Sequence, residues 1–262
     1  AGFLGVMYYF LPKQANLPLA SQRLAIFHFW SLILLGVWAG PHYILFPVLP
    51  EWTRTLGITC SLLLLIPAVS GVFNGIMTLK GHWDKLKSDP ILQFMITALI
   101  CYGLAAFDVA LLSTRTVDAL SHYTDWASGH VHGAALGWVT MLGIGTSYFL
   151  IPRLWGMRQL KSQRLLAAHF WLSVSGLLLY CTSMVAGGIK QGLQWQAIGP
   201  DGSLAYSFLE TVRTMHPFYV VSLVGGLLLL AGMCLMVYNV LLTMRAAHSR
   251  NALVQVLPGN EN

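Results

Sequence analysis

Two histidines lie close together in the long apolar stretch 127–150, in the sequence Gly129-His130-Val131-His132. On a helix, side chains two residues apart point about 200° away from each other. His130 and His132 then leave opposite faces and cannot share one metal ion, because ligands on one helix face need a spacing of three or four residues. Two separate cofactors fit this geometry, and a pair of haems would each take one axial imidazole.

Other ionisable residues also lie in apolar stretches, where burial of a charge is costly and a functional role is the first hypothesis. His42 follows Pro41, which would kink a helix, so His42 is either a metal ligand or a hydrogen-bonded core histidine. Asp108 could stay neutral, pair with a buried cation or pass protons, and we favour a proton-handling or haem-neighbour role. His28 and His169 each begin an apolar stretch beside an aromatic pair, which favours interfacial histidines of an aromatic belt.

The residues just before the stretch with His130 offer further polar partners for a cofactor. Asp118, His122 and Asp125 could contact haem propionates, or could satisfy backbone groups of a loop. Within the stretch itself, small residues would let a flat macrocycle approach the backbone. These residues are Gly129, Gly133, Gly137, Gly143 and Gly145.

The composition predicts a membrane protein. The chain of 262 residues is 56% hydrophobic and only 9% charged, with a mean hydropathy of +0.66. Charge this sparse cannot cover the surface of a soluble protein of this size. Six apolar stretches reach the ~20 helical residues that cross a bilayer, and they do not alternate as barrel strands do. We predict an all-α polytopic protein with one membrane domain over 1–262 and spans at 24–46, 56–79, 91–113, 127–150, 165–187 and 218–242.

The positive charges predict how these spans are oriented. Most Lys and Arg residues fall in the segments 13–23, 80–89, 153–164 and 245–250, whereas the alternate loops carry only Arg54, Arg115, Lys190 and Arg213. The positive-inside bias makes the first set cytoplasmic. The net charge of +6 therefore needs no nucleic-acid partner to explain it. The longest outer loop, 188–213, contains glycine pairs and turn residues, which predict an ordered loop that could dock a partner subunit.

The first eleven residues are apolar and end at Pro12-Lys13. They make about 16 Å of helix, roughly half the hydrocarbon thickness. They have neither an initiator Met nor a basic n-region, so they do not read as a signal peptide. We expect a half-helix that belongs to a longer or a split polypeptide.

A short pattern near this half-helix recurs later in the chain. Tyr9-Phe10-Leu11-Pro12-Lys13 leads to His28-Phe29-Trp30, and Tyr148-Phe149-Leu150-Ile151-Pro152-Arg153 leads to His169-Phe170-Trp171. Internal repeats are common in membrane bundles. A real repeat would relate the half-helix to the helix that bears His130 and His132. It would also predict a further metal ligand in the half that is not part of this chain.

Six motifs together resemble the catalytic subunit of cbb3-type cytochrome c oxidases, the C family of haem–copper oxidases. They are Trp38-Ala39-Gly40-Pro41-His42, Ser121-His122-Tyr123-Thr124-Asp125-Trp126, Gly129-His130-Val131-His132, Ala135-Leu136-Gly137-Trp138, Pro152-Arg153-Leu154-Trp155-Gly156 and Met215-His216-Pro217. The resemblance runs the whole length of the chain. It implies the end of helix six through helix twelve of a twelve-helix bundle.

The resemblance also implies roles for the histidines. His130 would be the axial ligand of the high-spin haem b, and His132 one ligand of the low-spin haem b, whose second ligand lies on a helix outside this chain. His42 would bind the copper that faces the high-spin haem. Another copper ligand would stand just before Ala1.

Several positions depart from the family pattern. Tyr43 stands where the family has a second copper-binding histidine, and a neutral phenol is a harder and weaker ligand. Gly36 stands where the family has a cross-linked tyrosine, and Asp108 replaces a glutamate. The family's inner proton path has tyrosines and a serine where this chain has Ala20, Gln22 and Ala25.

Three functions remain open at this point. The first is oxygen reduction, with Tyr43 or water in place of the lost copper ligand. The second is nitric oxide reduction, which needs only two electrons and two protons and for which harder ligands would suit non-haem iron. The third is a non-catalytic subunit in which His130 and His132 hold haem b for electron transfer or for structure.

The resemblance implies partners and a location as well. The sequence has no C-x-x-C-H motif for covalent haem, so electrons would come from c-type cytochrome subunits docked at the outer loops. Another chain or segment would supply helices one to six. The protein would be a multi-pass protein of the bacterial inner membrane, in contact with lipid and acting on a small gas.

Overall fold

The computed structural model describes residues 2–39 and 50–256, and their regular secondary structure is helical apart from one isolated β-bridge between Ile198 and Leu204. Six segments are long and apolar enough to cross a membrane. They are α2 (Gln22–Ala39), α3 (Glu51–Leu63) with α4 (Leu65–Thr78), α6 (Pro90–Leu112), α8 (Asp125–His132) with η2 (Gly133–Thr140) and α9 (Met141–Leu154), α10 (Gln163–Gln196) and α11 (Phe208–Val256). The predicted all-α membrane fold is confirmed.

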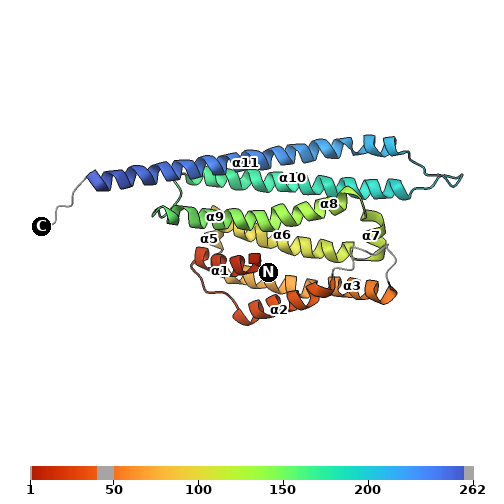
Figure 1. The fold of residues 1–262 in the computed structure, drawn as a ribbon, viewed down its shortest axis with the longest axis horizontal. Coiled ribbons are helices and arrows are strands. Elements are labelled where there is room, and N and C mark those ends of the chain that lie inside the picture. The colour runs from red at the N-terminus through yellow and green to blue at the C-terminus, as the bar shows by residue number, and fades with distance from the viewer. Residues whose placement is uncertain (1, 40–49, 257–262) are drawn as a thin grey trace.

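The helices lie side by side along one axis and alternate in direction (Figure 1). The shorter helices α1 (Gly2–Ala15) and α5 (Trp83–Ser88) lie at one end of this bundle, and α7 (Arg115–Ser121) lies at the other. The segments between α1 and α2, α4 and α6, and α9 and α10 share the first end. The basic segments that the sequence singles out therefore meet at one end of the bundle.

Local signals define where the helices begin. Asp89 caps α6, because its Oδ1 accepts from the backbone N–H groups of Ile91 and Leu92 at 2.9 and 3.3 Å, and Pro90 takes the first helical position. Ser162 caps α10 in the same way through Leu165. These caps stand at the basic end, where the chain leaves the apolar spans.

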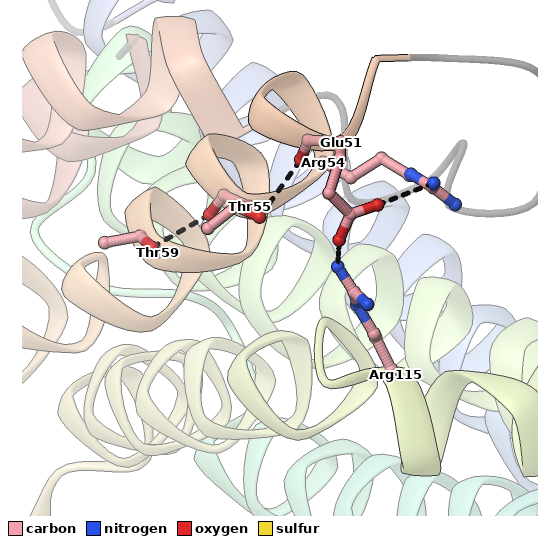
Figure 2. A network of polar contacts seen from close by, with 5 residues as sticks. All are labelled: Glu51, Arg54, Thr55, Thr59 and Arg115. Carbon is pink, nitrogen blue, oxygen red and sulfur yellow. Dashed lines mark hydrogen bonds and ion pairs between the residues drawn. The ribbon is translucent and has the colours of Figure 1, made fainter.

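Polar contacts tie the opposite end together (Figure 2). Glu51, at the start of α3, forms ion pairs with Arg54 of the same helix and with Arg115, at the start of α7. Further along α3, the Thr55 and Thr59 hydroxyls each donate to a backbone carbonyl one turn earlier, those of Glu51 and Thr55. Because the side chains of Glu51 and Arg115 are more than half exposed, we expect this link to orient α7 rather than to add much stability.

Helix α10 is longer than the apolar pattern predicts. It continues to Gln196, through Gly188 and Gly192, which the sequence places in the outer loop. A Cβ added at Gly188 would lie 2.0 Å from the backbone nitrogen of Trp126, and one at Gly192 would lie 2.0 Å from the carbonyl oxygen of Leu120. These glycines are therefore packing positions rather than turn positions. The rest of the loop is ordered, with Gly199 N–H donating to Ser203 O at 2.8 Å.

His28 and His169 are fully buried, so the expectation of interfacial histidines is wrong. Each ring is held by a tyrosine of the preceding helix, with Tyr8 Oη 2.7 Å from His28 Nδ1 and Tyr148 Oη 2.7 Å from His169 Nδ1. Such hydroxyl partners offset much of the cost of burying an imidazole. The aromatic residues beside each histidine lie on its own helix, and they give no sign of the tyrosine partner on the preceding helix.

The internal repeat is present in the structure as matching contacts. Ser21 and Asn74 exchange two hydrogen bonds, each of 2.9 Å, and Ser162 and Asn239 exchange the same two at 3.2 and 2.9 Å. Helices α1, α2 and α4 thus correspond to α9, α10 and α11. The counterpart of Tyr148 is Tyr8, not Tyr9, so the sequence alignment of the first helix is wrong by one residue.

Candidate functional site

His130 is anchored by a carboxylate of the neighbouring helix α6. Its Nδ1 lies 3.0 Å from Asp108 Oδ2, and Trp126 Nε1 donates to Asp108 Oδ1 at 3.1 Å. The His130 side chain is 8% exposed. In the neutral imidazole, a carboxylate partner at Nδ1 places the proton on Nδ1 and leaves the lone pair on Nε2. This is the tautomer that binds a metal through Nε2.

His132 is anchored by its own helix. Its Nδ1 lies 2.8 Å from the carbonyl oxygen of Ser128, which can only accept, so Nε2 again keeps the lone pair. The ring meets Tyr180 of α10 edge to face, with centroids 5.4 Å apart and planes at 73°. The two imidazoles thus contact different neighbouring helices, α6 and α10, although both line one cavity.

The other two deep histidines of the described residues differ in their partners. Both nitrogens of His28 are taken by phenol hydroxyls, Nδ1 by Tyr8 and Nε2 by Tyr102 at 2.8 Å. His169 has its Nδ1 on Tyr148, and its fully buried Nε2 has no partner among the described residues. His130 and His132 each combine an acceptor-only partner at Nδ1 with a position on the wall of one cavity, and His122 does so as well, with Asp118 as its partner.

That cavity has a volume of about 560 Å³ and lies where α7 meets α8. His130, His132, His122 and Asp118 all line it. His122 Nδ1 lies 3.3 Å from Asp118 Oδ1, which orients the ring. Asp125 is not part of this lining, and its backbone N–H donates instead to Gln191 of α10 at 2.9 Å. The structure therefore brings four of the predicted polar residues together and places Asp125 elsewhere.

A family model for cytochrome c and quinol oxidase polypeptide I matches residues 1–228. The chain belongs to this family. It is 51% identical to the cbb3-type cytochrome c oxidase subunit CcoN1 of Stutzerimonas stutzeri, over 94% of this chain and 52% of that protein. It is 49% identical to a cytochrome c oxidase subunit 1 homolog of Azorhizobium caulinodans, over 95% of this chain and 45% of that protein.

The comparisons confirm the resemblance to haem–copper oxidases. The chain spans about half the length of the curated relatives it matches. A solved heme-copper terminal oxidase dimer superposes with a TM-score of 0.69, at 17% identity, over 86% of this chain and 42% of that one. This likeness shows that the chain shares the fold of such an oxidase.

Three of the five glycines that the sequence singles out serve helix packing. A Cβ at Gly129 would lie 2.9 Å from Met184 Cβ, and one at Gly137 would lie 2.8 Å from Cys101 Cβ. Gly145 packs in the same way against Met95. Gly143 alone of the five has no neighbour within 4 Å of that position. The expectation that these glycines admit a flat macrocycle is therefore wrong for three of them, because neighbouring helices fill the space.

A π-helical segment, η2, directly follows His130 and His132. Thr140 Oγ1 donates to Ala135 O, five residues back, at 2.9 Å within η2. π-Helical turns are rare and are often found at functional sites. The widened turns shift the faces of α9 relative to those of α8. Apolar periodicity did not reveal this segment.

Sequence reasoning also missed a hydrogen-bonded chain that joins α1, α2 and α6, formed by Tyr8, His28 and Tyr102. Tyr102 packs against Trp138, with ring centroids 4.9 Å apart. It stands six residues before Asp108 on α6, about 9 Å along the helix. A tyrosine within an apolar span was the one signal that could have pointed to this chain.

Of the residues assigned to the predicted copper region, the structure describes Gly36 but not His42 or Tyr43, which lie outside the described residues. Gly36 lies on an exposed part of α2, and no other helix or side chain of the described residues comes within 4 Å of where a Cβ would stand.

Proposed function

We propose that this chain is the haem-bearing part of a respiratory terminal reductase, with His130 as the axial ligand of a high-spin haem b and His132 as a ligand of a low-spin haem b. The observation that carries the proposal is the pair of Nδ1–H hydrogen bonds, to Asp108 and to Ser128 O. They hold each ring in the tautomer and orientation that ligation requires. When bound, the haems would supply electron transfer and gas binding.

The residues around the cavity fit the edge of such a group. Half-buried His122 offers a ring nitrogen that can donate to a propionate, and Asp118, 7% exposed, belongs to this neighbourhood by orienting that ring. Asp108 gives His130 a negative partner, which makes the imidazole a stronger donor to iron. Its place in this pair supports a haem-neighbour role.

Protons must also reach a buried site. The chain Tyr8–His28–Tyr102 offers three groups that can each donate and accept, in an unbroken hydrogen-bonded row. A proton can enter at Tyr8 and leave at Tyr102. On the way, each group accepts a proton from one neighbour and donates its own proton to the next. We propose that this row supplies protons toward Asp108, in place of the family residues that are absent at Ala20, Gln22 and Ala25.

Oxygen is the substrate that the family relationship favours, with electrons from c-type cytochrome subunits and a non-haem metal bound near His42. The half of the relatives that this chain does not match would be supplied by another chain or segment of the complex, in the bacterial inner membrane. The test is oxygen uptake by the assembled complex with reduced cytochrome c. Copper at one atom per two haems would accompany this activity.

Nitric oxide is the second candidate, and a specific observation favours it. Gly36 and Tyr43 remove a proton donor and a soft ligand, and joining two NO molecules needs neither. Loss of NO with formation of N2O, and iron in excess of haem, would decide for this reaction. If neither gas is consumed by a complex with intact haem spectra, the chain is an electron-transfer or structural subunit.

A further inference from the structure

A polar cavity of about 370 Å³ lies at the end of the bundle that carries the basic segments. The ends of α1 and α9, the start of α6 and the segment before α10 form its walls, and the buried Tyr148 is part of the lining. Its volume falls in the range of small-ligand sites, about 300–1,000 Å³. It lies at the opposite end of the bundle from the cavity lined by His130 and His132.

The lining has more positive than negative charge. Lys13, Arg153 and Arg158 line the cavity, and Asp89 is the one carboxylate among the lining residues. Asp89 is already engaged, because one oxygen caps α6 and the other accepts from Gln14 Nε2 at 2.5 Å. No carboxylate of the described residues forms an ion pair with any of the three cations.

Two of the cations are held in place by neutral groups. Lys13 Nζ lies 4.0 Å from the centroid of the Tyr9 ring, and the Arg153 guanidinium lies 3.5 Å from that of Phe149. Cation–π contacts orient a charge without neutralising it. Arg158 is exposed and makes no hydrogen bond to another described residue. The cations thus keep their charge available to a ligand.

The geometry points to a binding site for a phosphate-bearing anion in this cavity. The planar fork of an arginine matches phosphate oxygens, and Gln159 and Gln163 add amide donors to the lining. Basic pockets between the inner ends of membrane helices bind anionic lipid headgroups. The anion could be such a headgroup or a soluble phosphate. The inference does not depend on the haem assignment.

The test uses the full assembled complex in nanodiscs of phosphatidylcholine. Native mass spectrometry measures the binding of added cardiolipin, and 31P exchange measures the binding of added inorganic phosphate. The variant Arg158→Gln removes one cation of the cavity. Arg164→Gln is the matched control, because Arg164 is exposed on the same end of the bundle but does not line the cavity.

Arg158→Gln should lower the affinity for the anion about fivefold, and Arg164→Gln should leave this affinity unchanged. Cardiolipin binding without phosphate binding identifies a lipid headgroup, and phosphate binding that cardiolipin does not displace identifies a soluble anion. Equal affinity in the two variants, or no binding of either probe, would overturn the inference. An unchanged melting temperature of Arg158→Gln shows that the loss is not unfolding.

Discussion

At His132, a single hydrogen bond to the Ser128 carbonyl decides which ring nitrogen is left for a metal. The same logic holds at His130, where the partner is a carboxylate. His28 shows the contrast, because two hydroxyls occupy both of its nitrogens. Residue type alone does not separate these cases, whereas the chemistry of the Nδ1 partner does.

We expect His132→Ala to remove the low-spin haem signal and to leave a five-coordinate haem, because the variant loses an axial nitrogen. Reduced-minus-oxidised optical spectra and paramagnetic resonance of the assembled complex measure this change. His248→Ala, at an exposed position near the end of α11, is the control and should change neither signal. A His132→Ala complex with an unaltered low-spin spectrum would refute the assignment.

We expect Asp108→Asn to lower turnover about 10- to 100-fold and to raise the reduction potential of the high-spin haem, because a neutral amide makes the His130 ring a weaker donor. Asp108→Glu retains the charge and should cost less. Redox titration alongside turnover distinguishes this role from mere packing. If Asp108→Asn leaves the reduction potential of the high-spin haem unchanged, the proposed action of Asp108 through His130 is wrong.

At the scale of elements, the two repeat units use the same tyrosine–histidine contact but different third partners. Helix α6 presents Tyr102 to His28, whereas it presents Phe94 to His169, with ring centroids 5.1 Å apart. The row of hydrogen bonds therefore continues in the first unit and stops in the second. The same tyrosine–histidine packing therefore leads to a hydrogen bond with Tyr102 in the first unit and to an apolar ring contact with Phe94 in the second.

This difference makes Tyr148→Phe a matched control for Tyr102→Phe. Both changes delete one buried hydroxyl that bonds a histidine. We expect Tyr102→Phe to slow turnover by roughly tenfold or more with intact haem spectra and an altered solvent isotope effect, because it interrupts proton transfer. Tyr148→Phe should cost stability but leave the isotope effect alone. Equal effects on turnover would mean that Tyr102 has only a structural role.

The crossing of α10 and α11 depends on two facing glycines. A Cβ at Gly225 would lie 2.7 Å from the carbonyl oxygen of Gly176 and 2.7 Å from the backbone nitrogen of Tyr180. Backbone atoms cannot move aside cheaply, so we expect Gly225→Ala to destabilise the bundle by about 1–3 kcal/mol. Gly226→Ala meets no atom within 4 Å and is the control. Thermal denaturation of the two variants gives the comparison, and a smaller loss at Gly225 would contradict it.

At the scale of the whole molecule, the four basic segments bias the orientation of every span. We expect a cysteine placed at His82 to react with a membrane-impermeant maleimide from the cytoplasmic side, and one placed at Ser203 to react from the other side. Both positions are exposed. The start of α5, which follows His82, and the connection from α10 to α11, which contains Ser203, lie at opposite ends of the bundle (Figure 1). Labelling of intact cells and of inverted vesicles separates the two. Labelling of both positions from one side would refute the alternation of the spans.

The sequence by itself determined the helical class, the number of spans and the end at which the basic segments gather. Hydropathy, charge and helical period are properties of neighbouring residues, so a one-dimensional chain already contains them. The repeat was also visible, although its register was wrong by one residue at Tyr8.

Only the tertiary structure decided which imidazoles have a nitrogen free for a metal, that His28 is buried, and that Gly129 and Gly188 serve packing. Each of these depends on a partner distant in the sequence, such as Tyr102, which is 74 residues from His28. Apolar periodicity shows that a helix has a buried face. It does not contain the identity of the atom that the neighbouring helix places opposite that face.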